Sequence, residues 1–115
     1  MLDLDYIEIE KDSIPYDFEI QLKGETFLFE INYNSLGEFL TVDLYKSEEL
    51  IVSGEKIVYG QPLFQNVSYL DIPKVAIIPW DLAEEENRVG LDNINEKVFL
   101  YIIDPEEQED ETLET

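Results

Sequence analysis

Carboxylates are the most abundant chemically capable side chains in this sequence, with 28 Asp and Glu residues against 7 Lys and Arg. Two carboxylates perform acid–base catalysis in glycosidases when they face each other across a cleft. Here no pair is distinguished from the rest by its spacing. His and Cys are absent, which removes the commonest general base, the commonest transition-metal ligand and every thiolate site. We therefore predict no catalytic residue and no cofactor, and we expect that the protein is not an enzyme.

Motifs for nucleophilic catalysis and nucleotide binding are also missing from the sequence. The serines have no His to activate them, and the sequence contains no GxSxG. It contains neither GxGxxG nor GxxxxGK[ST], the glycine patterns with which backbone N–H groups hold phosphates. Seven scattered bases do not form a groove that follows a phosphate backbone.

Two groups of acids have the composition of a site for a hard cation. Asp3 and Asp5 resemble the start of a calcium loop, but the glycine and the later bidentate Glu of such a loop are missing. Asp81 and the run Glu84–Glu86 are close in sequence, and we interpret them as solvated loop charge. We predict no metal site.

The stretch PWDLAEEENRVGLDN contains the single Trp, Trp80, and the single Arg, Arg88. It lies in a connection of about 17 residues between two apolar runs, and connections of that length are commonly functional. Trp80 has two interpretations: it covers the open end of the β body, or it lies at the centre of an interface, where Trp is enriched. Arg88 pairs with Glu84 four residues away or with a carboxylate of a partner. The residues predicted to bind a partner are Trp80, Asp81, Leu82, Arg88 and Leu91.

The charge of the chain is −21, and it is unevenly placed. Residues 105–115 carry six acids and no base, which leaves 22 acids and 7 bases on residues 1–104. Such a field repels nucleic acids and anionic membranes and attracts basic proteins and cations. A surface of this charge also serves solubility alone. We predict protein partners, with basic surfaces, and no binding to nucleic acid or membrane.

Apolar and polar residues alternate along most of the chain. YDFEIQL, FLFEINY and EFLTVDLY each place their apolar residues on one side, as strands with one buried face do. YIEIE near the start shows the same pattern. VFLYII at 98–103 is apolar on both faces, so we expect this strand to lie centrally and to be covered on both sides.

Turn residues fall between these runs and set the fold class. KGE at 23–25, NSLG at 34–37 and YKSEE at 45–49 predict turns, and SGE at 53–55 is expected to divide LIV from KIVY. The protein is predicted to be all-β, a small antiparallel barrel or sandwich of about seven to eight strands. One short helical turn is expected near 81–87, with Asp81 as its N-cap. We expect a single β domain over residues 1–104 and a disordered acidic tail over 105–115.

The order of these motifs resembles the bacteriophage baseplate plug family, a family of short all-β proteins of contractile-tail baseplates. The resemblance covers roughly residues 14–104, from IPYDFEIQLKGETFLFEINYN to VFLYIID. Three groups of residues fit its pattern: Phe18, Ile20, Leu22, Gly24, Tyr33 and Asn34; Gly54, Val58, Gly60, Pro62 and Leu63; and Leu91, Leu100, Tyr101, Ile103 and Asp104. This chain differs from the pattern in two places: it has LDN where a Gly is usual, and it has an acidic N-terminal strand and an acidic tail.

The resemblance implies a non-enzymatic structural component of a phage or prophage tail baseplate. Such a protein would bind neighbouring hub and tube proteins, here through strand edges and the 80–96 loop. The alternative is an acidic inhibitor, a DNA mimic or immunity protein that neutralises a basic enzyme. We expect a virion component, present in the host cytoplasm during assembly. The start of the chain, MLDLDYIEIE, lacks a basic region, and no apolar run is long enough to span a membrane.

Overall fold

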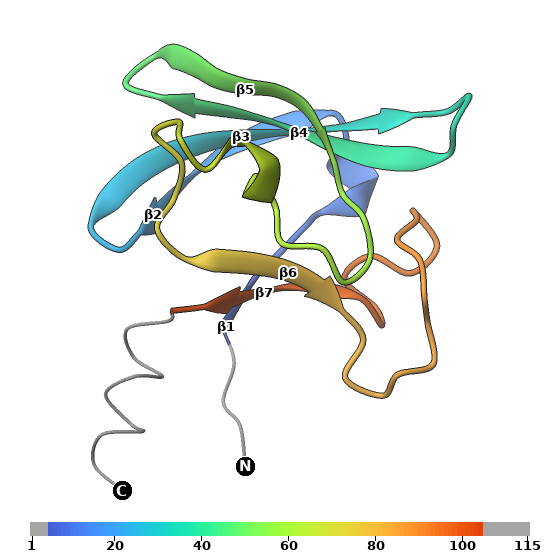
Figure 1. Cartoon of the computed structure of the whole chain (residues 1–115). Coiled ribbons are helices and arrows are strands. Elements are labelled where there is room, and N and C mark those ends of the chain that lie inside the picture. Colours follow the sequence, from blue (N-terminus) through green and yellow to red (C-terminus); the bar gives the residue numbers. More distant parts are fainter. Residues whose placement is uncertain (1–4, 105–115) are drawn as a thin grey trace, which may run out of the picture.

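The computed structural model describes residues 5–104, which form two antiparallel β-sheets packed as a sandwich (Figure 1). The four-stranded sheet has the order β2-β3-β4-β5, and the three-stranded sheet has the order β1-β7-β6. The strands are β1 (Asp5–Ile7), β2 (Tyr16–Leu22), β3 (Glu25–Asn34), β4 (Phe39–Lys46), β5 (Glu49–Lys56), β6 (Ala76–Trp80) and β7 (Phe99–Ile103). Two single 3₁₀ turns accompany them, η1 (Lys11–Ser13) and η2 (Gln65–Val67). The prediction of an all-β protein is confirmed, and the architecture is a sandwich rather than a closed barrel.

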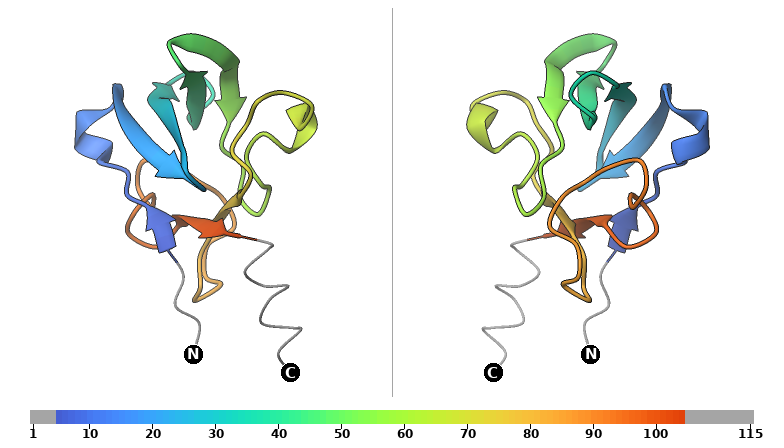
Figure 2. Two further views of the ribbon diagram at one scale, coloured as in Figure 1. Left: turned by 90° about the vertical axis from the view of Figure 1, so that its left-hand side faces the viewer. Right: turned by 90° about the vertical axis from the view of Figure 1, so that its right-hand side faces the viewer.

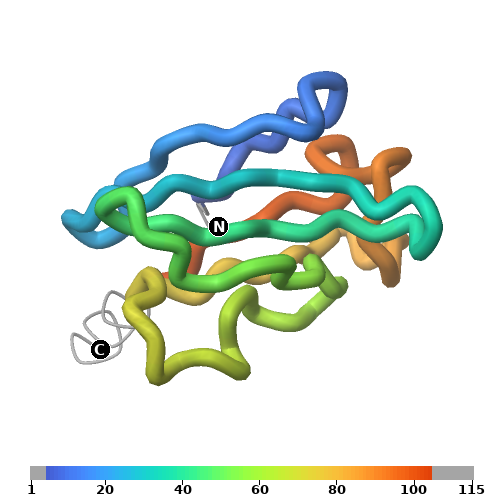
Figure 3. The backbone as a smooth tube through the Cα atoms, turned by 90° about the horizontal axis from the view of Figure 1, so that it is seen from above, coloured from blue at the N-terminus to red at the C-terminus, as the bar shows by residue number. Residues whose placement is uncertain are grey.

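The four-stranded sheet is a meander whose strands lie side by side in chain order (Figure 3). Two of its hairpins are closed by two-residue turns. In each turn both central residues have a positive φ, the conformation in which a two-residue turn matches the twist of the flanking strands. Between β2 and β3 these residues are Lys23 and Gly24, with φ of 55° and 81°. Between β4 and β5 they are Ser47 and Glu48, with φ of 52° and 66°. The chain also turns between the end of β3 at Asn34 and the start of β4 at Phe39. The turns predicted at 23–25, 34–37 and 45–49 are therefore confirmed.

The prediction that SGE at 53–55 divides two strands is wrong. β5 continues through Gly54, which has a φ of 71°, and the pairing with β4 shifts at this point. A shift of this kind is a β-bulge, which adds a residue to one strand and increases its twist. Asp43 on β4 stabilises the bulge, because its Oδ1 accepts the N–H of Gly54 at 2.6 Å. One bulged strand therefore replaces two of the expected short strands.

The three-stranded sheet joins the two ends of the described chain. β7 lies between β1 and β6, so its predicted central position is confirmed. The edge of β6 that faces away from β7 is hydrogen-bonded to the segment after β5. The carbonyl of Pro79 accepts the N–H of Gly60, and the carbonyl of Ile77 accepts the N–H of Leu63, both at 2.9 Å. This segment extends the sandwich on the β6 side.

The core lies between the two sheets (Figure 2). Phe29 on β3 is fully buried there, and its ring contacts the ring of Phe64 edge-on, with 6.1 Å between centroids. Ile77 and Leu100 close the core from the three-stranded sheet. Aligned packing of two sheets places alternate residues of each strand in one common core. The alternation read from the sequence therefore identified the inward faces of β2, β3 and β4.

Two expectations fall partly or wholly outside the described residues. The acidic tail at 105–115 lies outside them, and the domain boundaries at 1–104 stay a prediction. Within residues 5–104, the structure contains no helix of the length and apolarity that a membrane span requires.

Candidate partner-binding site

The loop after β6 is organised by the carboxylate of Asp81. Its Oδ1 accepts the N–H of Ala83 at 3.0 Å, and its Oδ2 accepts the N–H groups of Glu85 and Glu86 at 2.9 and 3.0 Å. Asp81 is only 4 % exposed. Burial raises the pKa of this carboxyl group, but the three backbone donors outweigh it and hold the pKa below its usual value. Asp81 thus fixes the loop from within.

The short helical turn expected at 81–87 does not form. The N–H of Glu84 bonds to the carbonyl of Asp81 at 2.8 Å, which closes one turn. Glu84 then has a φ of 57°, a left-handed conformation that ends any right-handed helix. Asp81 bonds to backbone N–H groups as a helix N-cap does, although no helix follows it.

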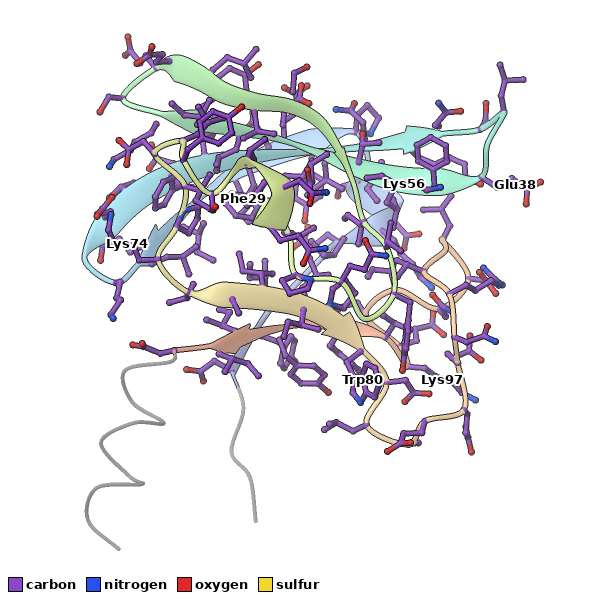
Figure 4. All side chains as sticks on the ribbon, in the orientation of Figure 1. Phe29, Glu38, Lys56, Lys74, Trp80 and Lys97 are labelled. Carbon is purple, nitrogen blue, oxygen red and sulfur yellow. The ribbon has the colours of Figure 1, made fainter. Side chains whose placement is uncertain are left out.

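Trp80 and Leu82 are the exposed apolar residues at the start of this loop. They are 36 % and 60 % exposed. The indole of Trp80 stacks on the ring of Tyr59, with 4.9 Å between centroids. It points away from the four-stranded sheet (Figure 4) and is not part of the core. Trp80 therefore lies at the end of β6 as a partly exposed ring supported by Tyr59.

Within the chain, Arg88 pairs with Asp92 and not with Glu84, the intrachain partner considered from the sequence. Its Nη2 binds Oδ2 of Asp92 at 2.5 Å, four residues towards the C-terminus, and both side chains are more than half exposed. This hydrogen bond lowers the pKa of the Asp92 carboxyl and raises that of Arg88. An ion pair so exposed contributes little to folding. Arg88 is therefore accessible from solvent while paired within its own loop.

Asn93 ties together the second half of the loop. Its Oδ1 accepts the N–H of Gly90 at 2.9 Å, and its Nδ2 donates to Oε1 of Glu86 and to the carbonyl of Arg88. The next residue, Ile94, is fully buried in the core. The LDN motif is thus a structural element, and the 81–98 connection is an ordered part of the fold.

A groove of about 800 Å³ lies between this loop and the β3–β4 hairpin. Arg88 and Leu91 line one side of the groove, and the hairpin end lines the other. Lys56 lies on the hairpin side, with its Nζ 4.5 Å from the centre of the Phe39 ring. Two of the predicted site residues are therefore brought together here, whereas Trp80 and Leu82 lie at the β6 end of the loop.

A cluster of aromatic residues on the three-stranded sheet was missed in the sequence. Tyr6 on β1 contacts Phe99 and Tyr101 on β7, with 4.8 and 6.3 Å between ring centroids. Tyr6 is 47 % exposed. The one sequence feature that pointed to this cluster was that VFLYII is apolar on both faces. We expected both faces of that strand to be covered by the rest of the protein. Covering by the described residues is incomplete, because Phe99 and Ile103 are only partly buried.

All seven bases of the chain lie in the described part and are already engaged there. Six are in ion pairs with acids of this chain, and Lys56 lies over the Phe39 ring. The charge exposed to a partner is therefore dominated by the surplus acids. No group of three or more acids in residues 5–104 is arranged to hold a metal ion.

Comparison with known proteins identifies one family. A family model described as cyanophage baseplate Pam3 plug gp18 matches residues 4–106, which is most of the chain. No curated protein and no solved structure gave a match.

Proposed function

The chain belongs to the family of the cyanophage baseplate Pam3 plug gp18, and on that premise we propose that it is a non-enzymatic structural protein of a phage or prophage tail baseplate. The match over residues 4–106 is the observation that carries this proposal. It spans both sheets and the 81–98 loop. The protein is accordingly a virion component, made and assembled in the host cytoplasm.

Neighbouring hub and tube proteins are the proposed partners. Two kinds of surface support this proposal. β2 is at the end of the four-stranded sheet, and an edge strand offers unpaired backbone groups to another chain. The loop beginning at Trp80 offers exposed apolar side chains on a framework held by Asp81. Asp81 itself is buried, so its role in this proposal is to shape the surface.

Purification of tails tests the proposed function. Tails from the phage or induced prophage that encodes the chain should contain it in fixed proportion to the other baseplate proteins, by quantitative mass spectrometry. An affinity-tagged chain should recover hub or tube subunits from the same lysate. Absence from purified tails, together with recovery of a basic enzyme such as a nuclease, would instead establish the acidic-inhibitor alternative.

A further inference from the structure

The outward face of the three-stranded sheet is apolar across all three strands. On β7, Leu100 points into the core, so Phe99, Tyr101 and Ile103 point outward. The register places outward residues of the neighbours beside them: Tyr6 and Ile78 lie opposite Tyr101, and Trp80 lies opposite Phe99. None of these belongs to the core between the sheets. We call this surface the aromatic face: Tyr6, Ile78, Trp80, Phe99, Tyr101 and Ile103.

The outer face of the four-stranded sheet is more polar than this one, although Leu28, Tyr45 and Leu50 lie in one row across it. Asp17, Glu30 and Asp43 lie directly opposite one another on β2, β3 and β4. They point outward, because the alternating residues Phe29, Val42 and Leu44 are buried in the core. An exposed sheet in a soluble protein normally carries polar residues on its outer face. The aromatic face departs from that rule: Tyr6 and Trp80 are its exposed members, at 47 % and 36 %, while Tyr101 between the neighbouring strands is only 8 % exposed. Exposed apolar side chains that lie together on one face mark interaction sites.

We propose that the aromatic face docks onto a neighbouring baseplate protein that presents an apolar patch bordered by Lys and Arg side chains. The class of partner rests on the proposed function, while the surface is inferred from its own chemistry. Tyr and Trp are the residue types that contribute most energy at interface centres. Leu82 is 60 % exposed and lies on the loop that extends beyond this sheet (Figure 2).

Charge and composition favour a separate partner protein over two other possible occupants of this face, a second copy of the chain and the chain's own residues 105–115. A second copy would bring another charge of −21 against the first. The chain's own residues 105–115 contain one large apolar residue, Leu113, and six acids. That composition cannot bury six apolar side chains. Because all seven bases are engaged within the chain, the surplus acids and those of residues 105–115 complement a basic border on the partner.

Hydroxyl-radical footprinting of the unmodified protein tests the surface directly. Oxidation of Tyr6 and Trp80 should be slower by about threefold or more in purified tails than in the isolated protein, because interface centres exclude water. Tyr69 is 81 % exposed and outside the aromatic face, so it is the internal reference. Equal oxidation rates at Tyr6 in the two states, in tails that contain the chain, would overturn this inference and leave the proposed function standing.

A matched pair of tyrosine variants adds a second readout. When Tyr6→Ala and Tyr69→Ala are each expressed together with the unmodified chain, Tyr6→Ala should be under-represented in tails by about tenfold, since aromatic anchors dominate binding. Tyr69→Ala should be incorporated equally. Cross-linking of intact tails then identifies the occupant: links from this face to an apolar, Lys-bordered segment of another protein support the proposal. Links to a second copy or to residues 105–115 overturn it, and a chain absent from tails overturns the proposed function as well.

Discussion

Trp80 and Tyr59 form a stacked pair, with 4.9 Å between ring centroids and 28° between ring planes. The hydroxyl group of the same tyrosine accepts the N–H of Asp81 at 3.1 Å. Tyr59 therefore supports the exposed indole and the buried carboxylate that follows it. This contact connects the segment after β5 with the end of β6.

Replacement of Tyr59 separates these two contacts. Tyr59→Phe removes only the acceptor for the Asp81 N–H and should lower the free energy of unfolding by about 1 kcal/mol. Tyr59→Leu also removes the stacked ring, which should cost about 0.5–1.5 kcal/mol more. Urea unfolding followed by fluorescence of the single Trp measures both. Equal stabilities for the two variants would show that the stacking contributes nothing.

Asp81 makes the stability of the loop depend on pH. Its pKa in the folded protein lies below its usual value of 3.8. The stabilisation is therefore fully present above the unfolded pKa and is lost as the pH falls through the lower folded pKa. Asp81→Asn should unfold at a lower urea concentration than the unmodified protein at pH 7, and this difference should shrink as the pH falls below about 4. A difference that stays constant down to about pH 2 would contradict the assigned role.

The bulge at Gly54 predicts a second local effect. Nothing lies within 4 Å of a Cβ atom built there, so Gly54→Ala meets no clash, and only its φ of 71° opposes the new side chain. A left-handed conformation costs a non-glycine residue about 1–2 kcal/mol. Thermal unfolding should show that loss for Gly54→Ala, and a smaller one for Gly54→Asn. Equal stability of Gly54→Ala and the unmodified protein would mean that the bulge relaxes.

The sequence predicted the parts of the fold in which neighbouring residues determine the outcome. Alternation fixed the inward faces of β2, β3 and β4, and turn residues fixed their hairpins. Gly54 misled because a glycine in a bulge and a glycine in a turn look alike without the register of the partner strand. The aromatic face was not predicted from the sequence for a related reason. Tyr6 and Phe99 are far apart in the chain and come together only when β1 pairs with β7.

The candidate loop shows the same limit at the level of single residues. Composition and loop length singled out Trp80, but they left open whether it covers the β body or lies at an interface. The burial of Asp81 and Ile94 was not predictable, because both depend on where the loop returns to the sandwich. A charged run such as Glu84–Glu86 predicts solvated side chains whether or not the loop packs against the sandwich.

Substitutions in the 81–98 connection should affect stability differently at its buried residue Ile94 and at its exposed residue Leu82. Ile94→Ala should lower the free energy of unfolding by about 2–5 kcal/mol, as for any buried Ile. Leu82→Ala, at a residue 60 % exposed in the same loop, should change it by less than about 0.5 kcal/mol. Chemical denaturation compares the two. A small effect of Ile94→Ala would show that the loop packs less tightly than its burial indicates.

Assembly distinguishes the apolar residues of the loop from its charges. Glu85 is exposed and binds Nζ of Lys97 at 2.9 Å, a surface pair whose removal by Glu85→Ala should change little. Trp80→Ala should reduce incorporation into tails by about tenfold when expressed with the unmodified chain, because it removes an aromatic side chain from the proposed interface. Circular dichroism of both purified variants first establishes that they fold. If folded Trp80→Ala and Glu85→Ala enter tails equally well, Trp80 has no role at an interface, and its contribution is limited to stacking on Tyr59.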